Sequence, residues 1–299
     1  MSLRGDPPEH ALSSAPAADA LFPWGKRTYV MGIVNVTPDS FSGDGIEDPE
    51  AAVARGIFLA ENGADVLDIG GESTRPGSTA VDPDEELRRV LPVIRALRGR
   101  VGVPISVDTY RASTAEAALN AGATIVNDVW GFRRDPDLAS IVARHGAHAI
   151  AMHNRRGAAS SAEHVGGFFP RMEYDDLIGD IVRGLDESVR ALMEAGVPRE
   201  RIIVDPGIGF GKTPEQNLEL LKRLDELRSL ELPLLVGPSR KSFIGLALGG
   251  LPPDERIEGT AAVVALAIAK GADMVRVHDL PAMARVARMA DAIVRGQKL

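Results

Sequence analysis

The sequence predicts an α/β protein that forms a single-domain (β/α)8 TIM barrel, and three observations lead to this prediction. Eight short apolar runs of strand length each end abruptly at a polar or catalytic-looking residue. A stretch of helix length, rich in Ala, Leu, Arg and Glu, separates each run from the next. The chain has 299 residues, and one barrel typically takes about 250. Because the active site of such a barrel forms where its strands end, the residues that close the runs are expected to meet in space.

The predicted strands have the length and apolar character of buried strands in a parallel sheet. In chain order they are Tyr29–Val34, Val66–Ile69, Ile105–Val107, Thr124–Val126, Ala147–Met152, Arg201–Val204, Leu234–Val236 and Met274–Val277. The residues that close them are Asn35, Gly71 with Glu72, Asp108, Asn127, His153, Asp205, Ser239 to Lys241, and His278. These closing residues are the first candidates for a functional site.

The predicted helices alternate with these strands. They are Pro49–Asn62, Asp84–Leu97, Thr114–Asn120, Pro136–His145, Asp175–Ala195, Pro214–Leu230, Gly259–Lys270 and Leu280–Gly296. Several end at a glycine suited to a left-handed C-cap, namely Gly63, Gly122, Gly146, Gly196 and Gly271. This recurring sequence pattern, in which a helix end is followed by a glycine and then a strand, is typical of the barrel face opposite the active site.

Composition and charge argue against several classes of protein. The net charge of −8 argues against a general nucleic-acid-binding protein, because phosphate contacts need clustered Lys and Arg. The chain has no cysteine, which excludes disulfides, thiolate nucleophiles and cysteine-bound metals. The longest apolar stretch, Ala261–Ala269, is far shorter than the roughly 20 residues that cross a bilayer. We expect a cytoplasmic protein that binds neither nucleic acid nor membrane.

The first 27 residues differ from the rest of the chain. They combine Pro8 and Ala-rich segments with acidic residues, and they lack the apolar core of a signal peptide. We predict that residues 1–27 form a flexible N-terminal extension and that residues 28–299 form one catalytic domain.

The eighth strand carries a candidate anion site. Alternate residues of a strand share a face, so Arg276 and His278 point to the same side. Arg offers a planar fork of donors to phosphate oxygens and His adds another donor, at a place where barrels commonly bind phosphate. The alternative is a structural Arg276 paired with a neighbouring carboxylate.

Polar side chains at four other strand ends suit a flat heterocycle. Asp108, Asn127 and Asp205 supply carboxylate and amide groups, and Lys241 follows the seventh strand. Such a set can pair with a guanine-like or pterin-like edge. Two other roles stay open: the carboxylates could bind a divalent metal or act as acid and base, and Lys241 could form a Schiff base.

The string Asp205-Pro-Gly-Ile-Gly-Phe-Gly-Lys-Thr213 is the most distinctive in the middle of the chain. Its glycine spacing is not that of a phosphate-binding P-loop. The glycines let the backbone approach a ligand, and Phe210 could lie against a ring face. Met152 and His153 are candidates for the same pocket, although His153 could equally be structural.

Two loops after the first two strands complete the predicted rim of the site. Asn35 offers a neutral oxygen suited to a hard cation that keeps several waters and bridges to phosphate. Thr74 and Arg75 could reach a phosphate or a carboxylate. Loops of this kind can close over a reacting centre.

Taken together, these strings resemble dihydropteroate synthase, the folate-pathway enzyme family that joins a pterin to p-aminobenzoate. Seven motifs carry the resemblance, NVTPDSFS, DIGGESTRPG, SVDT, NDV, MHN, DPGIGFGKT and SRKSFIG, followed by RVHD. Their order and spacing are highly specific, and the similarity runs from Tyr29 to Val294. The resemblance implies a transferase with a (β/α)8 barrel, usually a homodimer, that uses Mg²⁺.

The resemblance also implies roles for individual residues, each at the position that carries the family motif. The pterin would be held by Asp108, Asn127, Met152, Asp205, Phe210 and Lys241. The diphosphate would be bound by Asn35, Thr74, Arg75, Arg276 and His278, with Mg²⁺ on Asn35. The p-aminobenzoate pocket would be shaped by Phe41, Thr74, Pro76 and Ser242. The residues that the resemblance implies to be catalytic are Asn35, Arg75, Asp108, Asp205, Lys241, Arg276 and His278.

Three other functions compete with this one. A methyltetrahydrofolate-dependent methyltransferase has a similar barrel, but it leaves the NVTPDSFS and STRPG loops unexplained. A non-catalytic pterin-binding paralogue is disfavoured because Asn35, Arg75, Lys241, Arg276 and His278 are all present. A Schiff-base aldolase acting through Lys241 is the third.

Overall fold

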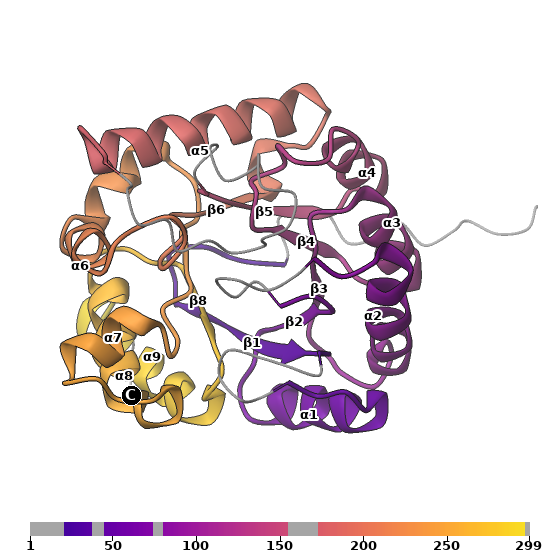
Figure 1. Cartoon of the computed structure of the whole chain (residues 1–299), viewed down its shortest axis with the longest axis horizontal. Helices are drawn as coiled ribbons and strands as arrows, with labels where there is room; N and C mark the ends of the chain where they lie inside the picture. The colour runs from indigo at the N-terminus through magenta and orange to yellow at the C-terminus, as the bar shows by residue number, and fades with distance from the viewer. Residues whose placement is uncertain (1–20, 38–44, 74–79, 155–172, 297–299) are drawn as a thin grey trace, which may run out of the picture.

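The computed structural model confirms a barrel of eight parallel strands surrounded by helices (Figure 1). The structure describes residues 21–37, 45–73, 80–154 and 173–296. The strands are β1 (Tyr29–Asn35), β2 (Val66–Gly70), β3 (Ile105–Asp108), β4 (Ile125–Asp128), β5 (His148–Met152), β6 (Ile202–Asp205), β7 (Leu235–Val236) and β8 (Met274–Val277). Each observed strand overlaps the predicted one.

The helices form the outer layer. They are α1 (Pro49–Glu61), α2 (Pro83–Leu97), α3 (Ala112–Ala121), α4 (Leu138–His145), α5 (Leu177–Glu194), α6 (Pro214–Lys222), α7 (Ser242–Ala247), α8 (Ile257–Ala269) and α9 (Leu280–Val294). The helix predicted for Pro214–Leu230 is shorter than expected, because α6 gives way to a 3₁₀ helix at Leu224–Leu230. The short helix α7 was not predicted.

The strands form a nearly closed ring. Their order is β6-β5-β4-β3-β2-β1-β8-β7, and all pairings are parallel. The remaining gap is bridged just before β7, where Val204 pairs with Leu234 and its amide donates to Pro233 O at 2.9 Å. The C-terminal ends of all eight strands therefore lie at one end of the ring.

The two faces of the strands have different partners. Residues that point outward pack with the helices in one large apolar cluster. Residues that point inward form a second cluster, which includes Met31, Val66, Ile150 and Met274. Further along the same inward faces the residues become polar, as at Asp68 and Arg276. The barrel interior is thus an apolar core with a polar layer at the C-terminal ends of the strands.

Part of the N-terminal segment packs against the other end of the barrel. The ring of Phe22, which is only 6 % exposed, stacks on Trp24 with centroids 4.9 Å apart. It also meets the edges of Tyr29 and His148 at 5.0 and 5.7 Å. Residues 21–27 of the predicted extension are therefore attached to the barrel, and residues 1–20 lie outside the described part of the chain. None of the described helices is long and apolar enough to span a bilayer.

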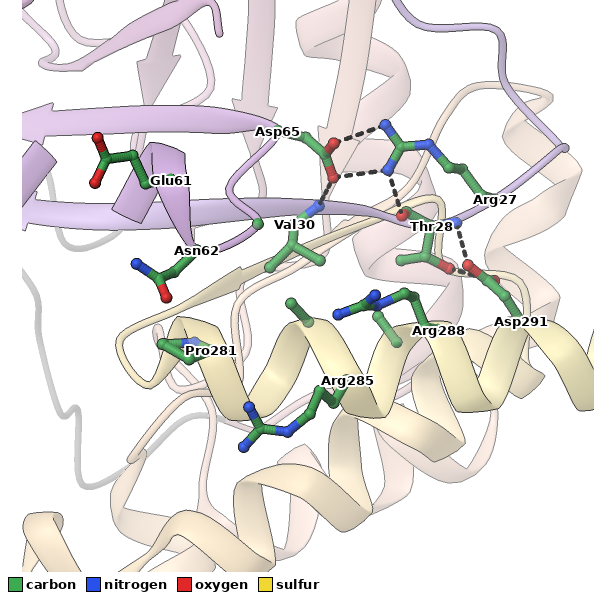
Figure 2. Close-up of a pocket in the computed structure, with 13 residues that line it drawn as sticks. Arg27, Thr28, Val30, Glu61, Asn62, Asp65, Pro281, Arg285, Arg288 and Asp291 are labelled. Carbon is green, nitrogen blue, oxygen red and sulfur yellow. Dashed lines mark hydrogen bonds and ion pairs between the residues drawn. The ribbon is translucent and has the colours of Figure 1, made fainter. Parts of the chain in front are cut away.

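Two carboxylates hold the start of β1 in place, as Figure 2 shows. Asp65 receives two hydrogen bonds from Arg27, at 2.9 and 2.6 Å, and one from the amide of Val30 at 2.8 Å. Asp291 on α9 accepts from the amide and the hydroxyl of Thr28, at 2.7 and 2.8 Å. A cavity of about 530 Å³ lies beside them, between the end of α1 and α9, on the outer flank of the barrel.

We predict that Asp291→Ala lowers the free energy of unfolding by about 3 kcal/mol. The change leaves the buried Thr28 amide without its acceptor and removes the carboxylate that pairs with Arg295 Nε at 2.9 Å. Urea unfolding followed by circular dichroism measures the loss. Arg285→Ala, at an exposed position of the same helix, is the control and should change stability by less than about 0.5 kcal/mol. Equal stability of the two variants would contradict the prediction.

Candidate active site

The centre of the polar layer is the guanidinium of Arg276. Its Nε donates to Asp68 Oδ2 at 2.6 Å, and its Nη2 donates to Asp108 Oδ2 at 2.8 Å. Asn127 Nδ2 donates to the same oxygen of Asp68 at 3.1 Å. One cation thus connects the inward faces of β8, β2 and β3, and through Asp68 it reaches β4. The Arg276 side chain is still 21 % exposed.

The charged groups of this network shift one another's pKa values. Burial, together with the nearby Asp68 carboxylate, raises the pKa of Asp108 to about 7 against the opposing effect of the Arg276 charge. Burial acts to lower the pKa of Arg276, but the carboxylates of Asp68 and Asp108 outweigh it and raise that pKa. Arg276 therefore stays charged, and Asp108 is the group of the pair whose protonation is finely balanced.

The loop after β6 brings Asp205 and Phe210 to the same end of the barrel. Asp205 Oδ1 accepts from the amide of Gly207 at 2.7 Å, and burial raises the pKa of Asp205 to about 6. Gly207 has a φ of +70°, and a Cβ there would lie 2.1 Å from the carbonyl oxygen of His153. Only glycine fits this turn.

Lys241 reaches toward this loop from β7. Its Nζ lies 4.1 Å from the centroid of the Phe210 ring, a cation–π contact. Burial lowers the pKa of Lys241 to about 8, although the carboxylates of Asp205 and Asp108 act in the opposite direction. Among the described residues, no hydrogen bond is made by Lys241 Nζ. This cation is therefore available to a ligand.

His278 and Asn35 lie on either side of the junction between β8 and β1. Ser239 Oγ accepts from the amide of His278 at 3.2 Å and lies 2.9 Å from His278 Nδ1. Because the Ser239 hydroxyl oxygen accepts from the amide, its own proton is left to donate to His278 Nδ1. Nδ1 is then the acceptor, so a neutral imidazole carries its proton on Nε2. Asn35 Oδ1 and Asp108 Oδ2 both lie close to Gly70, each 3.8 Å from the position that a Cβ on this glycine would occupy. The side chains of Asn35 and Asp108 therefore approach the same place at the end of β2.

A small apolar cluster lines the polar network. Tyr110, Val129, Trp130 and Met152 are buried together, and Phe210 packs against them. Met152 is 3 % exposed and comes directly from the end of β5. A flat ring with a polar edge would find an apolar wall and a set of polar partners here.

The comparisons with known proteins agree with this geometry. The family model of the pterin-binding enzymes matches residues 31–278. A dihydropteroate synthase of Clostridium beijerinckii is 48 % identical over 273 residues, which is 91 % of this chain and 96 % of the relative. One from Bacillus subtilis is 48 % identical over 270 residues and 90 % of both chains. The chain belongs to the dihydropteroate synthase family.

Solved structures of this family share the fold. A dihydropteroate synthase of Clostridium difficile, determined in the presence of pteroic acid, has a TM-score of 0.83 and 47 % identity, covering 92 % of this chain and 99 % of its own. The Xanthomonas albilineans enzyme in complex with 7,8-dihydropteroate has a TM-score of 0.76 and 39 % identity, covering 89 % and 93 %. The predicted barrel and the predicted enzyme, a transferase of folate biosynthesis, are confirmed.

Not all residues predicted from the family motifs can be placed. Asn35, Asp108, Asn127, Met152, Asp205, Phe210, Lys241, Arg276 and His278 lie at or just after the C-terminal strand ends. Phe41, Thr74, Arg75 and Pro76 lie outside the described residues. Ser242 is exposed at the first position of α7.

Two residues beside the candidate site, Asp68 and Lys212, are not among those predicted for it. Asp68 is fully buried and holds Arg276; its signal was a charged residue in the middle of an otherwise apolar strand. Ser239, one of the residues that close the seventh predicted strand, orients His278. Lys212 was considered only as part of a P-loop that the spacing excluded, yet it is 6 % exposed.

We predict that Asp68→Asn lowers the pKa of Asp108. The neighbouring negative charge of Asp68 raises that pKa, so its removal favours the ionised form of Asp108. The measurement is a pH titration of ¹³Cγ-labelled aspartate by NMR, with the Asp108 signal assigned through Asp108→Asn. Asp225→Asn, at an exposed ion pair with Lys270, is the control and should leave the titration unchanged. An unaltered Asp108 pKa in Asp68→Asn would show that the two carboxylates do not interact as described.

Proposed function

We propose that the protein condenses 6-hydroxymethyl-7,8-dihydropterin diphosphate with p-aminobenzoate, giving 7,8-dihydropteroate and pyrophosphate. The observation that carries the proposal is the pairing of two unlike half-sites at neighbouring strand ends. Carboxylate and amide groups of Asp108, Asn127 and Asp205 form one half, and the donors of Arg276 and His278 form the other. Family members solved with 4-aminobenzoic acid and with 7,8-dihydropteroate support it.

The pterin would occupy the first half. Its amino and ring N–H donors pair with the carboxylates of Asp108 and Asp205 and with the Asn127 amide oxygen. Lys241 Nζ, which has no hydrogen-bond partner among the described residues, donates to a ring nitrogen or carbonyl. Met152 and Phe210 supply the apolar wall. This assigns Lys241 to ligand binding by its charge and leaves no Schiff base in the reaction.

The diphosphate would occupy the second half. In this structure Arg276 pairs with carboxylates, which is the alternative that the sequence left open for it. Its side chain is still 21 % exposed, which leaves room for a phosphate as a second partner. We propose that Asp68 keeps Nε while the rest of the fork turns to phosphate oxygens. His278 adds the Nε2 donor. Thr74 and Arg75 are proposed to contribute from the second loop.

Mg²⁺ would bind between Asn35 and the diphosphate. The described residues hold no cluster of three or more His, Cys, Asp or Glu that could bind a metal by itself. A single neutral oxygen such as Asn35 Oδ1 fits an ion that keeps most of its waters and takes further oxygens from a phosphate substrate. When bound, the ion would stabilise the charge that grows on the leaving diphosphate.

The reaction then needs no nucleophile from the protein. The bond between the pterin methylene carbon and the diphosphate oxygen breaks, and the oxygen keeps the electron pair. The amine of p-aminobenzoate forms the new C–N bond and releases one proton. Arg276 and His278 stabilise the departing charge. Phe41, Thr74, Pro76 and Ser242 are proposed to shape the pocket of the incoming amine.

The competing functions explain less. The relatives matched over nearly their whole length are synthases, which leaves no support for a methyltransferase. A non-catalytic paralogue has no need for both half-sites, and the described members of both are present. We also propose that the enzyme is cytoplasmic. The chain has no cysteine, so its fold uses no disulfides and does not depend on an oxidising compartment.

The experiment is an assay of pyrophosphate release with the pterin diphosphate, Mg²⁺ and p-aminobenzoate. We expect stoichiometric pyrophosphate and 7,8-dihydropteroate, identified by mass spectrometry, and a loss of activity when Mg²⁺ is chelated. A reaction mixture without any product that contains both substrates would refute the proposal.

Two variants test the division of the site into a pterin half and a diphosphate half. Asp205→Asn should weaken binding of unphosphorylated 6-hydroxymethylpterin by at least about tenfold, equivalent to 1.4 kcal/mol. Arg276→Ala should mainly raise the KM for the diphosphate substrate, with folding checked by circular dichroism because Asp68 and Asp108 lose their cation. Equal losses for both ligands in both variants would show that the site is not divided in this way.

We also propose that the protein is a homodimer that pairs through α8 and its neighbours. Helix α8 is apolar nearly all round, which is typical of a helix buried on every side. Among the described residues, none covers the outer face of this helix at Leu266, which is 61 % exposed. Large apolar side chains on α7, just after α7 and on α9 extend this surface: Leu246, Leu248, Met289, Ile293 and Val294. Figure 1 shows these three helices together on one flank.

We predict that Leu266→Glu raises the dimer dissociation constant at least about tenfold, because a charge would be buried in an apolar interface. Sedimentation velocity across micromolar concentrations measures it. Met193→Glu changes another exposed apolar residue, on α5 and away from the proposed surface, and should leave the dimer intact. A wild-type monomer at these concentrations, or a dimer unaffected by Leu266→Glu, would overturn this proposal.

A further inference from the structure

Lys212 is a buried cation at the end of the β6 loop that the proposed reaction does not use. It is 6 % exposed and follows the glycine-rich segment that begins at Asp205. Burying an ammonium group is costly unless its donors are satisfied. The position of Lys212 therefore calls for an explanation in terms of its contacts.

Each donor of the ammonium group has an acceptor. Lys212 Nζ donates to the carbonyl oxygens of Gly207 at 3.0 Å and of Phe210 at 3.1 Å. It lies 3.2 Å from His153 Nδ1. An ammonium group has three N–H donors, and this set of three acceptors matches it when the imidazole is protonated on Nε2. The ammonium is thus fully engaged by protein atoms and does not reach the ligand itself.

The two carbonyls belong to residues that set the shape of the pterin side. Gly207 is the residue whose amide donates to the Asp205 carboxylate. Phe210 is the ring that meets Lys241 and packs beside Met152. One side chain therefore fixes the backbone at both ends of the segment that separates these two pocket residues. His153 attaches the same ammonium to the end of β5.

Other side chains hold different parts of the β6 loop, and only Lys212, among the described side chains, binds the carbonyls of both Gly207 and Phe210. Asn217 holds the middle of the segment, where its Oδ1 accepts from the amide of Gly209 at 2.7 Å. Tyr174 holds the end, through a hydrogen bond from its hydroxyl to Gly211 O at 3.0 Å. Gly207, Gly209 and Gly211 all have positive φ, so the segment has great backbone freedom when these contacts are lost. A backbone hydrogen bond from the Phe210 amide to Gly207 O at 3.0 Å closes the turn, and the side chains of Asn217, Tyr174 and Lys212 hold the closed turn in place.

We infer that Lys212 is a positioning residue for pterin recognition: its ammonium group holds the β6 loop so that Asp205 and Phe210 face the pterin. The inference rests on the proposed function for the identity of the ligand. It assigns Lys212 no contact with the substrate and no part in bond breaking. The loss of its ammonium group should therefore affect the pterin and leave p-aminobenzoate almost unaffected.

The test compares Lys212→Met with Lys222→Met, an exposed lysine of α6 that undergoes the same chemical change. Titration calorimetry with 6-hydroxymethylpterin measures binding without turnover. We expect Lys212→Met to raise the dissociation constant at least tenfold, while the KM for p-aminobenzoate at saturating pterin diphosphate changes less than twofold. Lys222→Met should match the wild type. An unchanged pterin dissociation constant in folded Lys212→Met would overturn the inference.

A second variant covers the case in which Lys212→Met fails to fold. The chain has no cysteine, so Lys212→Cys introduces one unique thiol. Alkylation with 2-bromoethylamine in urea, followed by refolding, places an ammonium group at nearly the reach of lysine. We expect pterin affinity to recover to within threefold of refolded wild type, whereas alkylation with ethyl iodide should not restore it. Equal affinity of the two alkylated proteins would show that packing, not the ammonium group, determines binding.

These outcomes are separate from the test of the proposed function. If the wild type binds pterin but forms no 7,8-dihydropteroate, the proposed reaction fails and the comparison of pterin affinities still decides the role of Lys212. If the wild type forms 7,8-dihydropteroate and Lys212→Met binds pterin normally, only the inference about Lys212 fails.

Discussion

The polar end of this barrel depends on the ion pair between Arg276 and two carboxylates. Asp68 is entirely buried, and an isolated carboxylate in that position would cost several kcal/mol. The guanidinium of Arg276 compensates this charge and that of Asp108, with N–O distances of 2.6 and 2.8 Å. Because the three groups come from β8, β2 and β3, the pairing requires the ring of strands to be closed in the correct register. Closure of the barrel and formation of the site are therefore one event in physical terms.

The same ion pair shows where prediction from the sequence succeeds and where it stops. Strand alternation places Arg276 and His278 on one face, and the barrel pattern places Asp108 and Asp205 at the same end. Both deductions need only local periodicity and the fold class. The partner of Arg276 is 208 residues away, and its identity depends on strand tilt and on the rotamers of both side chains. For that reason Asp68 was overlooked inside a motif, although a buried charge in an apolar strand always needs a partner.

The N-terminal segment was difficult to predict for a different reason. Its composition lacks the periodicity of a helix or strand, so the sequence favoured a flexible extension up to residue 27. Phe22 and Trp24 nevertheless pack against Tyr29 and cover the apolar end of the barrel. Isolated aromatic residues next to a strand gain their stabilisation from a surface that many distant residues build together. No local pattern contains that information, whereas the strands and helices carry it in their own alternation.

The three cations near the strand ends differ in how fully protein atoms engage them, and this order indicates their roles. Lys212 has an acceptor for every donor, so its charge is used within the fold. Arg276 shares its fork between two carboxylates and keeps part of its surface exposed, so it can exchange one partner for a ligand without losing the other. Lys241 meets only a ring face among its described contacts, so its hydrogen-bonding capacity is left for a ligand. A site that must bind a polar heterocycle beside a diphosphate needs this graded arrangement. Fully engaged cations would leave the ligand no donors, whereas Lys241 has donors left and is supported in its charged form by the carboxylates of Asp205 and Asp108.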